Sequence, residues 1–245
     1  MSANETNLGE QALGKVAEVA IASQLDQAEQ INVEIHTDPL KLVQGKLDSA
    51  AITGEGMVMN RELRVEAIEA HTDSINIDPM KAIAGQVELT QPTNAHAQIL
   101  LTEPDLNRAL SSDYIRGKMQ GLSVEIEGKP TLIDIDHAKI HLQEGELALD
   151  MTLLQRDNNE TKQLSAVAKP FLKDQGQRLD LEIVSAEGQH LTLEFATALF
   201  KKVMELLDLR KFELEGMRLT LNDISVREGK LLLRATSLVE KLPTA

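Results

Sequence analysis

The sequence contains one motif twice, as Asp38-Pro-Leu-Lys-Leu-Val-Gln-Gly45 and as Asp78-Pro-Met-Lys-Ala-Ile-Ala-Gly85. In each copy the aspartate can cap a short helix, because its carboxylate accepts hydrogen bonds from the first helical N–H groups. The proline suits the first helical position, where no donor is needed, and the glycine can take the left-handed conformation that ends a helix. The repeat therefore predicts a duplicated strand–short helix–strand unit, over about residues 33–52 and 75–92, that supports the fold rather than catalysis.

The composition predicts an aliphatic interior. Of the 245 residues 42% are apolar, yet the chain has no Trp, one Tyr and four Phe, so Leu, Ile, Val, Ala and Met must fill the core. Such an interior suits alkyl chains as well as it suits itself, which permits lipid binding without showing it. The absence of Cys excludes disulfides, thiolate metal sites and cysteine nucleophiles.

The net charge of −14 argues against nucleic acid as a partner. The charge is uneven: residues 1–195 carry 16 Lys and Arg against 32 Asp and Glu, whereas residues 196–245 carry 9 against 7. The basic residues near the last expected helix could meet an anionic lipid headgroup, or could serve only as a solvated helix surface; they are Lys201, Lys202, Arg210 and Lys211.

Hydrophobic periodicity predicts three longer helices among many strands. A helix over 7–25 is apolar nearly all round between Val16 and Ala22, so we expect it to be buried on several sides. A second begins at Thr102-Glu-Pro-Asp105, with Thr102 as its cap, and is interrupted at 111–113. The third covers 191–208 and has a wide apolar face.

Alternating apolar and polar residues predict antiparallel strands at 122–127, 130–142, 145–155, 161–169 and 177–186, followed by a closing hairpin with its turn at Arg227–Lys230. These long strands with one apolar face indicate an α+β fold. We expect a curved, mostly antiparallel sheet wrapped around apolar helices, and a single domain because no Pro-, Gly- or Ser-rich linker occurs.

No motif predicts catalysis, a cofactor or a metal. Asp134 and Asp136 should lie on one strand face and His137 and His141 on the other, so these four cannot converge on one ion unless a bulge intervenes. Neither a glycine-rich phosphate loop nor a Gly-x-Ser-x-Gly elbow is present. The N-terminal residues show no export signal and no stretch is apolar enough to span a membrane, so we expect a soluble, cytoplasmic protein that can act peripherally at a membrane.

Four stretches resemble the bacterial LmeA-like phospholipid-binding family, long catalogued as of unknown function. They are the two Asp-Pro-x-Lys-x-x-x-Gly units, Leu101-Thr-Glu-Pro-Asp-Leu-Asn107 and Leu207-Asp-Leu-Arg-Lys-Phe-Glu-Leu-Glu-Gly-Met-Arg-Leu219. The resemblance covers about residues 7–240 and implies a non-catalytic lipid-binding protein of the tubular type, in which a curved sheet cradles a long helix. It supplies no motif-defined catalytic residues. The best-known members act outside the cytoplasmic membrane, which differs from the compartment expected here.

The leading hypothesis is non-catalytic binding of a phospholipid or a related acyl lipid between the sheet and the helices, with transfer to or from a membrane. The candidate cavity residues, each of which could instead be ordinary core, are Val16, Ala20, Leu106, Leu110, Leu199, Val203 and Met204. An alternative is a protein-interaction scaffold with a solid core. A third hypothesis is an enzyme acting on a lipid or glycan, which convergent buried carboxylates or histidines at a cavity mouth would favour.

Overall fold

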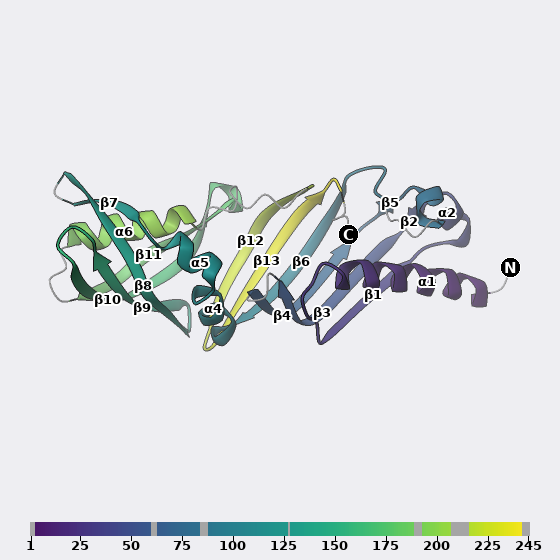
Figure 1. The fold of residues 1–245 in the computed structure, drawn as a ribbon. Coiled ribbons are helices and arrows are strands. Elements are labelled where there is room, and N and C mark those ends of the chain that lie inside the picture. The colour runs from purple at the N-terminus through teal and green to yellow at the C-terminus, as the bar shows by residue number, and fades with distance from the viewer. Residues whose placement is uncertain are drawn as a thin grey trace. The chain divides into compact units, whose positions relative to one another are not determined.

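The computed structural model describes residues 3–59, 63–83, 88–126, 128–188, 193–206 and 216–241. It confirms the α+β class and the mostly antiparallel sheet. The described residues group into two compact units (Figure 1). Unit 1 contains those up to Leu100 together with 216–222 and 233–241, and unit 2 contains those from Leu101 to Leu206 together with 223–232. The single-domain organisation stays a prediction, and each unit is described by itself.

Unit 1 is built on a six-stranded sheet with the order β1-β3-β4-β6-β13-β12. Strand β1 is at its edge and pairs antiparallel with β3. A separate two-stranded sheet joins β2 to β5. The strands are β1 (Gln30–His36), β2 (Lys46–Leu47), β3 (Ser49–Met59), β4 (Leu63–Thr72), β5 (Ile75–Asn76), β6 (Thr93–Thr102), β12 (Met217–Arg227) and β13 (Lys230–Val239).

Each copy of the repeated motif forms a five-residue helix, α2 (Pro39–Val43) and α3 (Pro79–Ile83). The Asp38 carboxylate accepts from the Leu40 amide at 2.8 Å, and Asp78 does the same for the Met80 amide at 2.9 Å. The lysine of each motif bonds an acidic side chain seven residues later, Lys41 to Asp48 and Lys81 to Glu88. The two motifs thus share a cap, a proline and an ion pair.

The two motifs also pair with each other, which the sequence did not indicate. Lys46 and Leu47 of β2 lie opposite Asn76 and Ile75 of β5. Next to this pairing, the Ile77 amide donates to the carbonyl oxygen of Gly45 at 2.7 Å. Gly45 has φ +73°, a conformation that glycine adopts readily. The repeat therefore closes on itself where the Gly45–β2 junction of the first unit meets β5 and Ile77 of the second.

Helix α1 (Ala3–Ala22) corresponds to the helix expected over 7–25, but it begins earlier and its burial differs from the prediction. Its side chains Leu13, Ala17 and Ile21 pack on the core, whereas Val19 is 69% exposed. The expectation of burial on several sides was wrong, because apolar composition alone does not show how many neighbours a helix has. Only one side of α1 packs against the sheet.

Helix α1 covers the free edge of β1. The Glu18 carboxylate accepts from the Val33 amide at 3.3 Å, and the Glu10 carboxylate accepts from the Thr37 amide at 2.8 Å. Eight helical residues rise about 12 Å, and four strand residues span about 13 Å, so the two glutamates match alternate edge amides. Gly14 lies midway between them, and a Cβ there would be 2.5 Å from the Val33 oxygen. The stripe Glu10-Gly14-Glu18 thus protects an edge that could otherwise pair with another chain.

Unit 2 contains the antiparallel meander expected from the sequence, with the order β11-β10-β9-β8-β7. Helix α6 packs against both end strands, β7 and β11, so the sheet curls around it. Its Leu199 and Phe200 are among the most deeply buried side chains, together with Ile133, Leu153 and Leu164 of the strands. The elements are α4 (Glu103–Leu110), α5 (Asp113–Lys118), β7 (Leu122–Ile126), β8 (Lys129–Gln143), β9 (Glu146–Gln155), β10 (Glu160–Lys173), the 3₁₀ turn η1 (Asp174–Gly176), β11 (Arg178–Gly188) and α6 (Leu193–Leu206).

A buried carboxylate ties the curled sheet of unit 2 to the turn that precedes β7. Asp134 accepts two hydrogen bonds from the Arg156 guanidinium, each at 2.7 Å, and a third from the Gly121 amide at 2.6 Å. The Arg156 hydrogen bond lowers the pKa of Asp134 below its ordinary value, and the Gly121 amide acts in the same direction. The ionised form of Asp134 is therefore the one that stabilises the folded unit.

Replacing this carboxylate should make stability less dependent on acid pH. Because the pKa of Asp134 is lower in the folded than in the unfolded protein, its carboxylate stabilises the fold fully at pH values above the unfolded-state pKa. This stabilisation is lost as the pH falls through the folded-state pKa. We expect Asp134→Asn to lower the free energy of unfolding by about 2 kcal/mol at pH 6, with a gap from wild type that shrinks below about pH 4. Urea unfolding followed by circular dichroism measures this gap. Asp136→Asn, at an exposed neighbouring position, should leave stability nearly unchanged; a constant gap for Asp134→Asn at all pH values would contradict the prediction.

Candidate functional site

The strands of unit 1 have one aliphatic face and one polar face. The register across β1, β3, β4 and β6 places the aliphatic side chains of these strands in three cross-strand rows. The aliphatic rows are Ile35, Ala50, Thr72, Ala95; then Val33, Ile52, Ala70, Ala97; then Ile31, Gly54, Ile68, Ile99. The alternating rows are mostly polar, and they are Glu34, Ala51, His71, His96; then Asn32, Thr53, Glu69, Gln98.

The aliphatic face is buried at one side and only half-buried at the other. At its β1 side, Val33 and Ile35 are buried against α1. On β4 and β6 the side chains of the same face are only half-buried, namely Ile68, Ala70, Thr72, Ala95, Ala97 and Ile99. Alanine is common in this part, so the surface has low relief. A half-covered apolar surface of this kind gains free energy when an alkyl group removes it from water.

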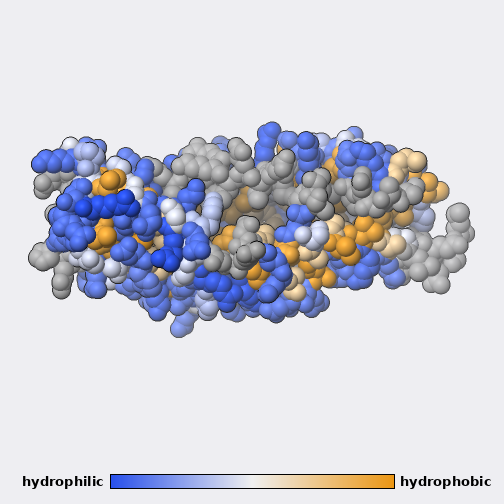
Figure 2. All heavy atoms as spheres, viewed as in Figure 1, coloured by the Kyte–Doolittle hydropathy of each residue, from blue (hydrophilic) through white to orange (hydrophobic). Residues whose placement is uncertain are grey.

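Two elements border this face. Helix α1 lies along its β1 side through Leu13, Ala17 and Ile21. The paired motifs contribute to the same cluster of packed residues, with Leu47 and Ile77 buried and Leu42, Ile75 and Leu89 partly buried. Figure 2 shows hydrophobic side chains gathered around α1. The half-buried aliphatic surface is therefore continuous with a well-packed core.

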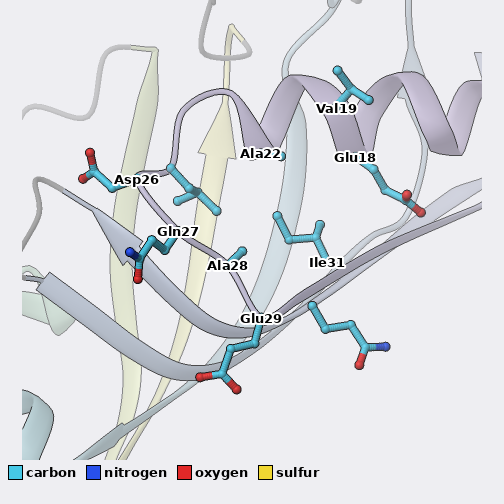
Figure 3. A pocket seen from close by; sticks show the side chains of 10 residues that line it. Glu18, Val19, Ala22, Asp26, Gln27, Ala28, Glu29 and Ile31 are labelled. Carbon is cyan, nitrogen blue, oxygen red and sulfur yellow. The ribbon is translucent and has the colours of Figure 1, made fainter.

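A cleft of about 420 Å³ lies where α1 ends and the chain turns into β1 (Figure 3). It is lined by apolar side chains from both elements, Val19, Ala22, Leu25 and Ile31, and by charged ones, Glu18, Asp26 and Glu29. Ile31 belongs both to this lining and to the aliphatic face. The cleft thus adjoins the last of the three aliphatic rows.

The charged groups of this cleft have partners within unit 1. Lys15 bonds the Glu18 carboxylate and, as the largest cause, lowers its pKa; the Val33 amide acts in the same direction. Glu29 bonds Arg64 at 3.0 Å. These carboxylates therefore serve in ion pairs and edge protection, and their arrangement does not indicate proton transfer.

Two further clefts lie beside α1 and beside α4. One, of about 450 Å³, lies along α1 and β1 and is lined by Glu10, Gln11, Lys15 and Glu18 of the helix and by residues 32–36 of the strand. The other, of about 740 Å³, lies in unit 2 beside the start of α4. There Glu103 bonds His141 at 3.1 Å and accepts from the Leu142 amide at 2.9 Å, and the latter bond is the main cause of its lowered pKa. Glu103 is thus occupied in joining α4 to β8.

Among the described residues, Asp134, Asp136, His137 and His141 do not form a metal-binding group. A register shift between Ile135 and His137 places a bulge at Asp136, the irregularity that the sequence argument had named as an exception. Even so, Asp134 binds Arg156 and His141 binds Glu103. Across the described part of the chain, no three His, Asp or Glu side chains are grouped so that they could hold an ion.

The cavity residues predicted from the sequence fall into different units. Val16 is half-buried and Ala20 exposed on α1 of unit 1. In unit 2, Leu106 and Leu110 of α4 and Val203 of α6 are half-buried, while Leu199 is completely buried in the core. The side chain of Met204 lies outside the described residues. The clefts above are lined by other residues, so this cavity stays a prediction.

The predicted headgroup residues are placed only in part. Lys201 is exposed and Lys202 is half-buried, both on α6 of unit 2. Arg210 and Lys211 lie outside the described residues. The role of these four residues therefore also stays a prediction.

Comparison with known proteins adds a family-level finding. The model of the LmeA-like phospholipid-binding family matches residues 5–236, nearly the whole chain. No curated protein gives a significant match. Among the helices that the structure describes, none has the length and apolar character needed to cross a bilayer.

Proposed function

Because this chain belongs to the LmeA-like phospholipid-binding family, we propose that it binds the acyl part of a phospholipid or related lipid on the aliphatic face of unit 1, without changing the lipid chemically. The headgroup would then lie toward water, and the bound lipid could be passed to or from a membrane by a protein acting at its surface. The half-buried side chains of β4 and β6 are the observation that carries this proposal.

The chemistry of that face suits an alkyl chain. Its cross-strand rows contain Ile, Val, Ala and Gly, with Thr72 as the one hydroxyl. Burying each methylene of a lipid against such a surface contributes roughly 0.8 kcal/mol, so a long chain can be held without hydrogen bonds. Among the described side chains of this face, no pair is arranged for nucleophilic or acid–base catalysis, which fits binding better than turnover.

The contrast with unit 2 supports placing the lipid in unit 1. In unit 2, α6 occupies the inside of the curled sheet, where Leu199 and Phe200 are 0% and 1% exposed. In unit 1, α1 covers only the β1 side of the aliphatic face, and side chains of that face on β4 and β6 are half-buried. An acyl chain would cover in unit 1 the kind of surface that α6 already covers in unit 2.

A bulky side chain on this face should block lipid binding. Ala97 and Gln98 are neighbours on β6 that point to opposite faces. We expect Ala97→Trp to lose at least nine-tenths of the lipid that wild type retains, because the indole occupies the alkyl surface, and Gln98→Trp to retain the wild-type amount. The measurement is native mass spectrometry after incubation with vesicles of phosphatidylglycerol and phosphatidylethanolamine, with extraction and identification of the bound lipid.

The neighbouring strand provides an independent pair, Ala70→Trp on the aliphatic face and Glu69→Trp on the polar face. Circular dichroism verifies that each variant is folded. Equal lipid retention by the folded aliphatic-face variants and their polar-face controls would show that the acyl chain binds elsewhere. A wild-type protein that carries no lipid after this incubation would instead favour the scaffold alternative.

A further inference from the structure

The repeated helices expose large apolar side chains. Leu40 and Val43 of α2 are 70% and 78% exposed, and Met80 of α3 is 75% exposed. Leu40 and Met80 occupy the same position in the two motifs, directly after the proline. A single exposed Leu is ordinary on a protein surface. Three such residues on the two copies of a repeated motif indicate a functional surface.

The pairing of the motifs brings these residues to one part of unit 1. Strand β2 follows α2, strand β5 precedes α3, and the two strands pair directly. Next to them, the Ile77 amide donates to the carbonyl oxygen of Gly45. In Figure 2, hydrophobic side chains reach the surface at α2. We call Leu40, Val43 and Met80 the apolar tip. Below it, Leu42, Leu47, Ile75 and Ile77 join the core that borders the aliphatic face.

The first backbone N–H groups of α2 and α3 are capped, which lowers the cost of moving the apolar tip into an apolar environment. Asp38 accepts the Leu40 amide, and Asp78 accepts the amides of Met80 and Lys81. Pro39 and Pro79 have no N–H to satisfy. Unsatisfied N–H groups are what make helix ends costly to move into lipid. Capping removes much of that cost from the first turn of both helices.

The charge around the apolar tip is nearly balanced. The motifs and the residues that follow them carry Lys41, Lys46 and Lys81 against Asp38, Asp48, Asp78 and Glu88. Lys41 and Lys81 bond two of these acids. On a chain with a net charge of −14, such a region approaches an anionic lipid surface with less repulsion than an acidic one would.

The size of the apolar tip favours a membrane over a protein partner. A stable protein interface takes about 800 Å² and 20–30 residues from each side, whereas the tip has three large side chains on two five-residue helices. Shallow insertion of a few apolar side chains between lipid headgroups needs no matching partner surface, because acyl chains adapt to them.

We propose that the apolar tip of α2 and α3 docks unit 1 onto a phospholipid bilayer. This inference rests on the proposed function and gives it a direction: the end of unit 1 that bears the duplicated motifs meets the membrane from which lipid is taken or to which it is given. Docking by apolar insertion should depend only weakly on salt, because two of the three nearby lysines, Lys41 and Lys81, are already paired with acidic side chains.

Vesicle flotation tests the proposal. The probe is a vesicle of phosphatidylglycerol and phosphatidylethanolamine, and the variant is Leu40→Ser/Val43→Ser/Met80→Ser. We expect at least a tenfold lower partition into vesicles than for wild type. The matched control removes three exposed apolar side chains from unit 2, Tyr114→Ser/Leu132→Ser/Val184→Ser, and should float like wild type. All replaced side chains are exposed, so both variants should fold, as circular dichroism would verify.

A second readout separates docking from lipid binding. Uptake of monomeric dihexanoyl phosphatidylglycerol requires no vesicle, and native mass spectrometry measures it. We expect the tip variant to take up this lipid as wild type does. Docking would be overturned, with lipid binding left intact, if the tip variant floated with vesicles as wild type does. The same conclusion would follow if wild type did not float but still took up the short lipid. A wild-type dimer that the tip variant converts to monomer would overturn it in favour of a second copy.

Discussion

Gly45→Ala should disrupt the pairing of the two motifs and strongly destabilise that part of unit 1. The added Cβ would clash with the Ile77 carbonyl oxygen and would lie 3.0 Å from Pro79 Cδ. It would also have to take φ +73°, which costs a residue with a side chain about 1–2 kcal/mol. Because the clash involves backbone, which cannot simply change rotamer, we expect a total loss of about 3 kcal/mol or more.

Gly145→Ala separates these two effects. Gly145 has φ +74°, and no atom lies within 4 Å of the place that an added Cβ would occupy, so its replacement should cost only the conformational part, about 1–2 kcal/mol. Hydrogen exchange followed by mass spectrometry measures the local effect, and the amides of Leu47 and Ile75–Ile77 should lose protection in Gly45→Ala. Equal protection of these amides in wild type and in Gly45→Ala would show that the pairing does not depend on the close approach at Gly45.

Gly14→Ala should lift α1 from the edge of β1. The new Cβ would lie 2.5 Å from the Val33 oxygen, a backbone atom, so the helix must shift and the Glu10 and Glu18 hydrogen bonds must lengthen. Overpacking of this kind costs typically about 1–3 kcal/mol, although alanine is by itself the better helix former. We expect the Val33 and Thr37 amides to exchange faster and the protein to self-associate at the uncovered edge.

The control for this change is Gly117→Ala on α5, where nothing lies within 4 Å of the added methyl. There the helix propensity acts alone and should stabilise by up to about 1 kcal/mol. Opposite signs for the two substitutions are the expected result, measured by urea unfolding and by size-exclusion chromatography. A stabilising effect of Gly14→Ala would show that α1 does not need its close contact with the strand.

Local signals in the sequence predicted the elements that depend on neighbouring residues. Thr102 caps α4 together with Asp105 as expected, and Ser112 caps α5 after the interruption at 111–113. The meander was predictable because each of its strands alternates apolar and polar residues and pairs with the next strand in the chain. The same holds for the hairpin of β12 and β13, whose turn lies where the sequence placed it.

Features that depend on distant partners could not be predicted in this way. The aliphatic face of unit 1 arises from the register of four strands that are not all consecutive. On β4 the apolar residues Leu63, Val65 and Ala67 alternate in one phase, whereas Ile68 and Ala70 follow the other phase. The sequence pattern therefore did not indicate which face of β4 is aliphatic. The apolar composition of α1 likewise gave no sign that the helix covers a strand edge with one stripe.

The route of the chain through unit 1 has a consequence for its biogenesis. Strands β12 and β13 complete the six-stranded sheet, with β13 next to β6. The chain between β6 and β12, however, contributes the whole five-stranded meander of unit 2. During synthesis from the N-terminus, β6 must therefore wait with one unpaired edge until more than a hundred residues have followed it. The nascent protein is most vulnerable to mispairing in that interval, and we expect a chaperone that shields strand edges to associate with it at that stage.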